Sequence, residues 1–354
     1  MSPRGLYGAR ALNAWIAAGG RPQHAPALHR LRAAWHGALF ERNWASSQAR
    51  IASAPAPQEP LFILGLWRSG TTVLHELLTA TGSFVTPLTW QCFNPSTCFL
   101  TGPPERDASA ARPMDAGRIA ALGPQEDEFA LTLLGEPSVY RGLIDPRRLR
   151  ECGAKLWQDE EGELARWRDF VRGVAVGAPG ARLLLKSPSH TFRLPRLQAA
   201  YPRARFLWIG RHTGEVLGSS VRMWRAMFGQ YALWDCPQDA LESFLGDMLS
   251  AYARMLEWAL RHMTPERLQW IDFEALRTDA RTVLSSALQF AHAGAHSSGE
   301  LEEPIERALE RVPVHSGERA ALPEDPRVRE AAALMSAVRA RFGLGGRSAA
   351  GAPA

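Results

Sequence analysis

Residues 65–72 form a glycine- and hydroxyl-rich segment whose residue types suit the binding of an anion. The segment reads Gly-Leu-Trp-Arg-Ser-Gly-Thr-Thr. It overlaps the end of the apolar run at 61–66, which has the length of a buried strand. Apolar residues then recur with helical spacing at positions 73, 74, 77 and 78. Because backbone N–H groups at a helix N-terminus point toward a bound anion, the segment predicts a phosphate-binding loop.

The loop lacks the groups that handle a nucleoside triphosphate. Its glycines have the spacing of GxxxxGK[ST], but Thr71 stands where the lysine that reaches the β- and γ-phosphates is found. Arg68 supplies a cation from inside the loop instead. The later apolar run 205–210 continues into Arg211 rather than ending in an aspartate for Mg²⁺. We therefore expect no metal, and an anion bound by Arg68, Ser69, Gly70, Thr71 and Thr72.

The rest of the chain predicts an α/β fold that would position this loop. Apolar runs of strand length at 182–186, 205–210 and 268–273 are separated by helical patterns. Such alternation predicts a parallel sheet with helices on both faces. We expect a helical N-terminal extension over 1–54, one α/β domain over 55–342 whose segment 85–180 shapes an acceptor site, and a disordered tail over 343–354.

Composition places the chain among globular proteins. Of its 354 residues, 46% are hydrophobic and 22% are charged, which excludes fibrous and disordered classes. The apolar stretches fall short of the roughly 18 to 20 residues that cross a bilayer, so no membrane span is expected. The 4 cysteines have no CxxC spacing, which favours the reducing cytoplasm and argues against a zinc site.

The charge of the chain favours a small anionic ligand. The formal net charge is +5, and no polybasic run concentrates it, so nucleic acid is not an expected partner. Almost all basic residues are arginines; the two lysines are Lys155 and Lys186. Lys186 ends one of the predicted strands, where a cation can reach a ligand above the sheet.

The loop and two later segments together resemble the signature of sulfotransferases that use 3′-phosphoadenosine 5′-phosphosulfate (PAPS). The loop is similar to the family's 5′-phosphosulfate loop, with Arg68 in the place of Lys or Arg. Arg211 and Ser219 match the pair that holds the 3′-phosphate in this family, and Lys186 matches the lysine that ends its central strand. Residues 270–276 are similar to its late "YEDL" segment, and 124–129 resemble an acidic stretch of a bacterial branch.

This resemblance implies a phosphate-loop fold of the nucleotide-kinase type. It also implies transfer of a sulfuryl group from PAPS to a hydroxyl of a small-molecule or lipid-like acceptor. In such a reaction Arg68 and Lys186 would stabilise the charge that develops on the leaving phosphate. The aromatic residues that could line an apolar acceptor pocket, or simply belong to the core, are Trp67, Trp90, Phe93 and Phe129.

The general base is the point at which the chain departs from the family. Many cytosolic members have a histidine where this chain has Pro188, and other branches use a glutamate whose counterpart here is Gln91. An amide cannot accept the proton of the acceptor hydroxyl. The remaining candidates, with the two glutamates favoured and His190 next, are Glu126, Glu128, His190 and His75.

Two other function classes stay open. One is a phosphate-loop kinase or nucleotide triphosphatase, which the absence of a lysine at Thr71 disfavours. The other is a catalytically inactive nucleotide-binding relative of the sulfotransferases, which the loss of both usual bases allows. Magnesium-dependent ATP binding would support the first class, and absence of turnover would support the second.

Overall fold

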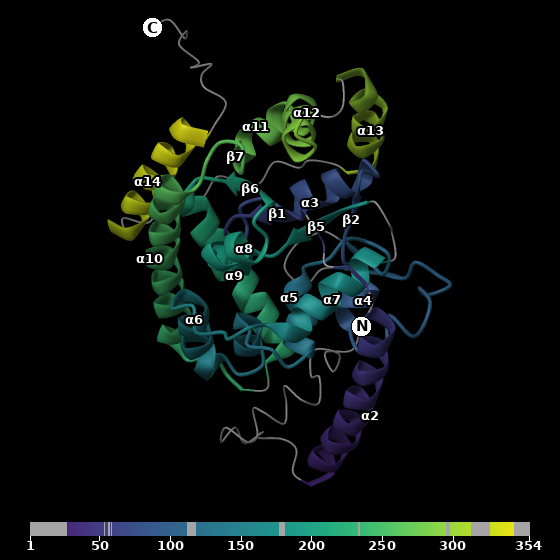
Figure 1. Ribbon diagram of the computed structural model, residues 1–354. Coiled ribbons are helices and arrows are strands. Elements are labelled where there is room, and N and C mark those ends of the chain that lie inside the picture. Colours follow the sequence, from purple (N-terminus) through teal and green to yellow (C-terminus); the bar gives the residue numbers. More distant parts are fainter. Residues whose placement is uncertain are drawn as a thin grey trace, which may run out of the picture.

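A five-stranded parallel sheet forms the centre of the computed structural model (Figure 1). The structure describes residues 27–52, 54–55, 57, 59–111, 118–176, 181–232, 234–294, 298–312 and 326–342, so the tail expected at 343–354 lies outside the described residues. The strands follow the order β2-β5-β1-β6-β7, and each neighbouring pair is parallel. Their bounds are β1 Leu61–Leu64, β2 Phe84–Val85, β5 Arg182–Lys186, β6 Arg205–Gly210 and β7 Leu268–Asp272.

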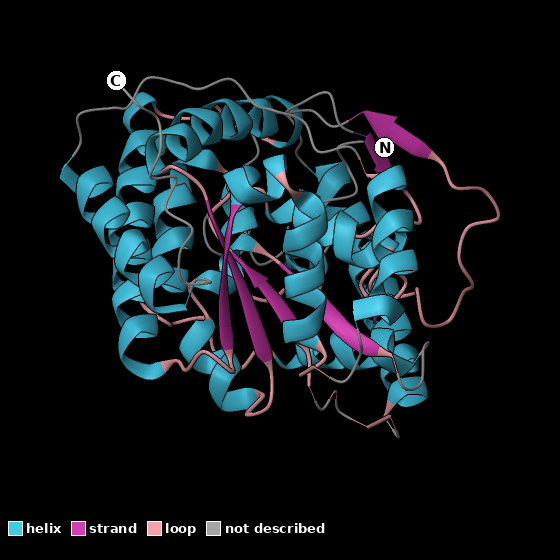
Figure 2. Ribbon diagram, turned by 90° about the horizontal axis from the view of Figure 1, so that it is seen from above, coloured by secondary structure: helices cyan, strands magenta, loops and turns pink. Residues whose placement is uncertain are grey.

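Helices cover both sides of this sheet (Figure 2), as the sequence predicts. The α-helices are α2 Ala27–Ile51, α3 Thr71–Ala80, α4 Thr89–Phe93, α5 Asp127–Leu133, α6 Leu149–Trp157, α7 Ala165–Val176, α8 Leu194–Ala200, α9 Thr213–Tyr231, α10 Gln238–His262, α11 Phe273–Thr278, α12 Ala280–Ala291, α13 Ser298–Arg311 and α14 Pro326–Phe342. Within the described residues, the 3-10 helices are η2 Val139–Leu143, η3 Pro146–Arg148 and η4 Pro188–Thr191. None of the described helices is both long and apolar enough to span a membrane.

Alternate side chains of the strands enter two separate cores, because successive residues of a strand point to opposite faces. Leu61 and Ile63 of β1 pack with Leu207 of β6 against α3, α12 and α13. Phe62 of β1 and Phe206 of β6 enter the larger core, which contains residues of α5 to α10 and α14. Burial on both faces explains why these strands are continuous apolar runs rather than alternating ones.

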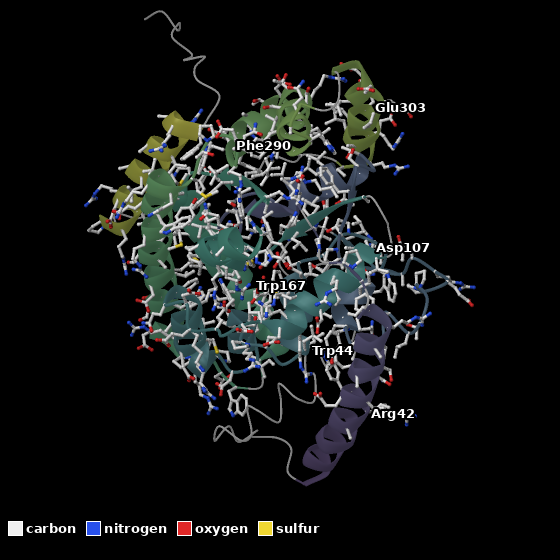
Figure 3. All side chains as sticks on the ribbon, viewed as in Figure 1. Arg42, Trp44, Asp107, Trp167, Phe290 and Glu303 are labelled. Atoms are coloured by element: carbon white, nitrogen blue, oxygen red, sulfur yellow. The ribbon has the colours of Figure 1, made fainter. Side chains whose placement is uncertain are left out.

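The long helix α2 packs through one of its sides. Trp44 is almost completely buried, whereas Arg42, two residues earlier, is exposed (Figure 3). Gln48 Nε2 donates to the carboxylate of Asp169 on α7 at 2.7 Å, and the hydroxyl of Ser47 donates to the carbonyl of Ser96 at 2.9 Å. These contacts attach the helix to the α/β unit, within the region expected to form an N-terminal extension.

The segment between β1 and β5 contains strands that the sequence analysis missed. The two-residue strand β2 adds an edge to the sheet beside β5. Strands β3 Ser109–Ala111 and β4 Arg118–Ala120 pair antiparallel as a separate two-stranded sheet. Strands this short leave no periodic pattern in the sequence, which is why they could not be predicted.

Candidate active site

The phosphate-loop segment joins the end of β1 to the first turn of α3 and contains three residues with positive φ. These angles are 147° at Gly65, 71° at Arg68 and 101° at Gly70. A Cβ atom at Gly65 would lie 2.6 Å from the carbonyl oxygen of Ile209, and one at Gly70 would lie 2.3 Å from the ring of Phe273. Both glycines are therefore required by conformation and by close packing.

A hydroxyl from η4 holds the start of this loop. The Thr191 hydroxyl accepts from the Gly65 N–H at 2.8 Å and donates to the Gly65 carbonyl at 3.1 Å. Inside the loop, the Ser69 hydroxyl donates to the Leu66 carbonyl at 2.8 Å. Thr191 was not predicted from the sequence, and its distance of 126 positions from Gly65 leaves no local signal. These bonds fix the start of the loop to η4 and tie Ser69 back to Leu66.

Arg68 and Ser219 meet directly. Nε of Arg68 donates to the Ser219 hydroxyl at 3.0 Å, although the two residues are 151 positions apart. Ser219 lies about two turns into α9, as its spacing from Arg211 predicts. The structure thus brings together two residues that the sequence analysis placed on the sulfate and on the 3′-phosphate.

Arg211 directly follows β6 and is oriented by two neighbours. Its Nε donates to the Glu215 carboxylate at 2.9 Å, and its guanidinium lies 4.7 Å from the ring centroid of Phe273. The same phenylalanine ring closes over Gly70 of the phosphate loop. Phe273, in the segment that resembles "YEDL", therefore fixes the position of Arg211 relative to the loop.

Lys186 lies between the phosphate loop and the acidic segment. Parallel pairing places Lys186 beside Ile63 of β1, so both strands end at the loop. Its Nζ is 2.8 Å from Oε1 of Glu126 and 3.4 Å from the Thr72 hydroxyl at the start of α3. The Lys186 side chain is 2% exposed and that of Glu126 is 13% exposed. Glu126 is therefore the more accessible member of a largely enclosed ion pair.

The second oxygen of Glu126 is also bound. The Tyr140 hydroxyl of η2 donates to Oε2 of Glu126, and Nε1 of Trp67 donates to the Tyr140 oxygen at 3.0 Å. The sequence analysis did not identify Tyr140. Burial and the adjacent Glu126 raise the pKa of the Tyr140 hydroxyl well above its usual value. Tyr140 therefore keeps its proton and acts as a donor.

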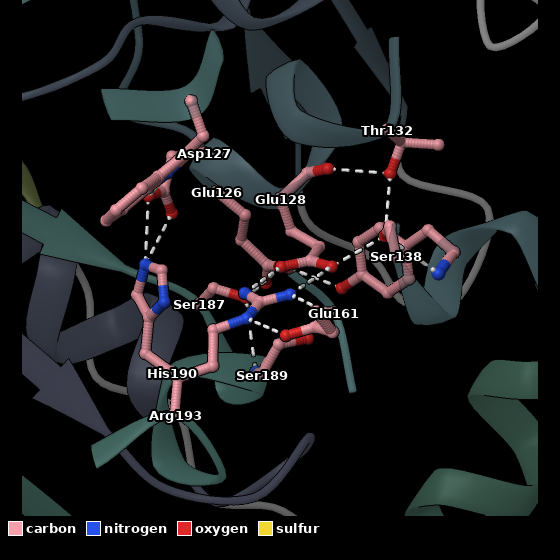
Figure 4. Close-up of polar contacts among 12 residues, drawn as sticks. Glu126, Asp127, Glu128, Thr132, Ser138, Glu161, Ser187, Ser189, His190 and Arg193 are labelled. Atoms are coloured by element: carbon pink, nitrogen blue, oxygen red, sulfur yellow. Dashed lines mark hydrogen bonds and ion pairs between the residues drawn. The ribbon is translucent and has the colours of Figure 1, made fainter. Parts of the chain in front are cut away.

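Glu128, the other favoured glutamate, lies in the protein interior. The guanidinium of Arg193 bonds to both of its oxygens, at 2.6 and 3.1 Å, and also to Glu161, at 2.6 and 2.7 Å (Figure 4). The Ser138 hydroxyl donates to Oε1 of Glu128 at 2.6 Å. The Glu128 side chain is 0% exposed. Of the two favoured glutamates, Glu128 is thus enclosed and ion-paired, whereas Glu126 is partly exposed.

His190 is enclosed as well. Its Nε2 lies 2.9 Å from the Asp127 carboxylate, which also accepts from Nε1 of Trp167 at 2.7 Å (Figure 4). The His190 side chain is 1% exposed and Asp127 is 0% exposed. His190 thus pairs with a buried acid in the core, an arrangement that orients α5 against η4. His190, the next base candidate after the two glutamates, therefore has its described partners inside the core.

His75 and Gln91 also have structural partners. Nε2 of His75 lies 2.7 Å from the Thr86 hydroxyl, and burial, followed by the charge of Lys186, lowers the pKa of His75 well below its usual value. The side-chain oxygen of Gln91 accepts from the Leu88 N–H at 2.9 Å and closes the first turn of α4. Of the base candidates Glu126, Glu128, His190 and His75, Glu126 is the one whose side chain forms an ion pair with Lys186.

The four candidate acceptor-site aromatics separate into two groups. Trp67 is 2% and Phe129 8% exposed, so both belong to the core, whereas Trp90 and Phe93 are half-buried. The ring of Phe93 lies 5.1 Å from that of Phe129, which in turn lies 5.0 Å from the ring of Tyr140. An aromatic row thus leads from a half-buried position to the residue that contacts Glu126.

Two further features concern ligands. A hollow of about 340 Å³ between α9 and the start of α10 is separate from the predicted site residues; it is lined by Val221, Arg225, Phe228, Cys236, Pro237, Leu241 and Glu242. Within the described ranges, histidine, cysteine and acidic side chains form no group of three that could hold a metal ion.

Comparison with known proteins decides the family. A sequence profile described as "Sulfotransferase family" matches residues 60–296, which is more than half of the chain. The chain belongs to the sulfotransferase family. This assignment agrees with the resemblance carried by the phosphate loop, Lys186, Arg211 and Ser219. It favours the sulfotransferase interpretation over that of a phosphate-loop kinase.

Two curated sulfotransferases share 30% identity with this one over 255 residues. They are the omega-hydroxy-beta-dihydromenaquinone-9 sulfotransferases Stf3 of Mycobacterium bovis and Mycobacterium tuberculosis. The match covers 69% of this chain and 66% of each relative, slightly less than two thirds of their length.

Solved mycobacterial sulfotransferases share the fold. STF1 from Mycobacterium tuberculosis superposes with a TM-score of 0.60 at 17% identity, over 96% of this chain and 91% of that one. STF9 from Mycobacterium avium gives 0.61 at 21% identity, over 86% and 81% of the two chains. These likenesses concern the arrangement of the sheet and its helices.

Proposed function

We propose that this sulfotransferase transfers the sulfuryl group of PAPS to a hydroxyl of an apolar, lipid-like acceptor. The observation that carries the proposal is the position of Lys186, whose ammonium lies between Thr72 of the phosphate loop and Glu126. A cation at this point can contact the donor's sulfate while the carboxylate beside it faces the incoming hydroxyl.

The donor would occupy the loop between β1 and α3. N–H groups at the start of α3 and the cations of Arg68 and Lys186 would bind the 5′-phosphosulfate. Arg211 and Ser219 would bind the 3′-phosphate; in support, Arg211 follows β6 at the same edge of the sheet and is held by Glu215 and Phe273. Hydrogen bonding of Ser219 to Arg68 would then link the two phosphate positions.

In the reaction, the acceptor oxygen attacks sulfur in line with the leaving group. The new O–S bond forms as the bond from sulfur to the bridging oxygen breaks, and that electron pair stays on the phosphate of 3′-phosphoadenosine 5′-phosphate. Glu126 takes the proton of the acceptor hydroxyl. Lys186 has three N–H donors, so it can bond to oxygens of the transferring sulfuryl group and the departing phosphate while it remains beside Glu126.

A lipid-like acceptor is supported by two observations. The aromatic row of Phe93, Phe129 and Tyr140 leads from a half-buried position to the residue that contacts Glu126 and offers apolar surface beside the reacting atoms. The relatives in the genus Mycobacterium are named for a hydroxylated menaquinone derivative. We place the reaction in the cytoplasm, which suits the four unpaired cysteines.

The test is transfer of labelled sulfate from PAPS to a long-chain isoprenoid alcohol by the intact chain and by Glu126→Gln. We expect turnover by the parent, and about a hundredfold slower transfer by the variant with unchanged binding of adenosine 3′,5′-bisphosphate. Glu163→Gln is the matched control, because Glu163 is an exposed residue paired with Arg168. Full activity of Glu126→Gln would exclude Glu126 as the base.

A further inference from the structure

A chain of two hydrogen bonds joins the phosphate loop to Glu126. Nε1 of Trp67 lies 3.0 Å from the hydroxyl oxygen of Tyr140, and that hydroxyl lies against Oε2 of Glu126. Trp67 directly precedes Arg68 in the loop. The bonds therefore run from the segment that would bind the donor to the carboxylate that would accept the proton.

The direction of both bonds follows from the chemistry of the groups. An indole N–H can only donate, so the Tyr140 oxygen must accept from Trp67. The proton of the phenol is then left for Glu126, whose carboxylate can only accept. Burial, and next the charge of Glu126, raise the pKa of Tyr140 well above its usual range, which keeps the phenol in the donor form.

Tyr140 is itself held in place on several sides. Its backbone N–H donates to the Ser138 hydroxyl at 3.1 Å. Its ring lies 5.0 Å from that of Phe129 and 6.4 Å from that of Trp224. Its side chain is 5% exposed, so water does not compete for the bond to Glu126. A donor fixed in this way can fix its acceptor.

We propose that Tyr140 is a positioning residue that, together with Trp67, holds Glu126 so that Oε1 alone faces the sulfuryl position. Oε2 is occupied by the phenol, whereas Oε1 points to Lys186 beside Thr72. The acceptor proton therefore goes to Oε1. This inference rests on the proposed role of Glu126 and adds the residues that set its orientation.

Several ionisable groups surround this carboxylate from different elements, and Tyr140→Phe leaves their identities unchanged. Lys186 of β5 contacts Glu126 directly. Cys92 of α4 is within electrostatic range of Glu126 and Lys186, and His75 of α3 is within range of Lys186. Glu128 of α5 acts on Tyr140 and is ion-paired with Arg193, which it shares with Glu161. A change in pH dependence on removal of the phenol can therefore be assigned to the lost hydrogen bond.

The test is the pH profile of sulfate transfer by Tyr140→Phe. Loss of one donor to the carboxylate makes its charged form less favourable, so the acid limb of the kcat profile should move toward higher pH. At the plateau, kcat should fall roughly tenfold because the carboxylate is free to rotate, while KM for PAPS stays unchanged. If Tyr140 had only a packing role, the substitution would leave the acid limb where it is. It would also not lower kcat while KM for PAPS stays unchanged.

Two further variants separate positioning from folding. Tyr252→Phe removes the same phenol from a buried bond with Nε1 of Trp208, also 3.0 Å long, in the core; it should leave kcat and the pH profile unchanged. Trp67→Phe removes the first donor of the chain and should shift the acid limb in the same direction as Tyr140→Phe, by less. If Tyr140→Phe does not fold, the pH profile of Trp67→Phe provides the test of the hydrogen-bond chain.

The decisive comparison uses Glu126→Gln as background. If Tyr140 acts through Glu126, the double variant should be no slower than Glu126→Gln alone, because the group it positions is already absent. If Tyr140→Phe slows the Glu126→Gln enzyme by the same tenfold, or leaves the parent profile unmoved, the positioning role is wrong although Glu126 remains the base. Full activity of Glu126→Gln would instead overturn the proposed function.

Discussion

The ammonium of Lys186 lies 2.8 Å from Oε1 of Glu126 and 3.4 Å from the hydroxyl of Thr72, at the carboxyl end of strand β5. One buried cation thus contacts the phosphate-binding segment and the candidate base at once. Under the proposed function, this ion pair would hold the carboxylate beside the reacting group. Charge that appears on the leaving phosphate would form beside this cation.

Lys186→Ala should therefore reduce the transfer rate far more than the affinity for nucleotide. Stabilisation that acts mainly in the transition state appears in kcat, and we expect a loss of at least about a hundredfold. The dissociation constant of adenosine 3′,5′-bisphosphate, measured by isothermal titration calorimetry, should change several-fold at most. Lys155→Ala is the matched control, since Lys155 is the other lysine and lies half exposed on α6. Near-normal turnover of Lys186→Ala would remove this residue from the mechanism.

Arg211→Ala should lower the affinity for adenosine 3′,5′-bisphosphate by about one to two orders of magnitude. A charge-assisted hydrogen bond contributes about 1.5 to 3 kcal/mol, and AMP lacks the phosphate that would receive it. Affinity for AMP should therefore stay unchanged, and neither ligand should require Mg²⁺. Arg225→Ala on α9, which lines the separate hollow, controls for the loss of one positive charge. If the affinities for both nucleotides fall equally, Arg211 does not bind the 3′-phosphate.

Arg193→Met should destabilise the fold in a pH-dependent way. Although burial opposes it, the paired Glu128 and Glu161 raise the pKa of Arg193 well above its usual value. Its charge therefore contributes stability at all pH values below the ordinary arginine range. Removing it leaves two buried carboxylates without a cation, which costs about 3 to 5 kcal/mol near neutral pH.

Urea unfolding at pH 7 and pH 5 measures this effect. The deficit of Arg193→Met should shrink at the lower pH, because protonated carboxyl groups need no counter-charge. Arg168→Met breaks the exposed pair with Glu163 and should unfold like the parent. A deficit that is equal at both pH values would mean that lost packing, and not charge, dominates.

Gly70→Ala should lower nucleotide affinity, whereas Gly162→Ala should not. Both glycines have positive φ, 101° and 72°, so alanine is strained by roughly 1 to 2 kcal/mol at either position. A Cβ at Gly162 meets open space, but one at Gly70 would lie 2.3 Å from the ring of Phe273, which holds Arg211. Calorimetry with adenosine 3′,5′-bisphosphate and thermal unfolding separate the two effects. If the two variants have the same nucleotide affinity and the same thermal stability, the ring of Phe273 can move away from the added Cβ without cost.

The sequence by itself determined the four longer strands of the central sheet and the loop, because their signals are local. Buried parallel strands are continuous apolar runs, so the runs at 182–186 and 205–210 coincide with Arg182–Lys186 and Arg205–Gly210. The phosphate loop is contiguous and is bounded by glycines that its positive φ angles require. The family and the parallel sheet could both be predicted from such segments.

Only the tertiary structure decided which acidic residue faces Lys186. Glu126 and Glu128 are two positions apart, but Glu126 precedes the first turn of α5 and Glu128 lies within it, so their side chains leave the backbone in different directions. Glu128 meets Arg193 from 65 positions away, and Glu126 meets Lys186 from 60. Tyr140 and Thr191 join the site in the same way, through η2 and η4. Contacts between residues so far apart in the sequence depend on how helices pack on the sheet, and no local pattern in the chain encodes that packing.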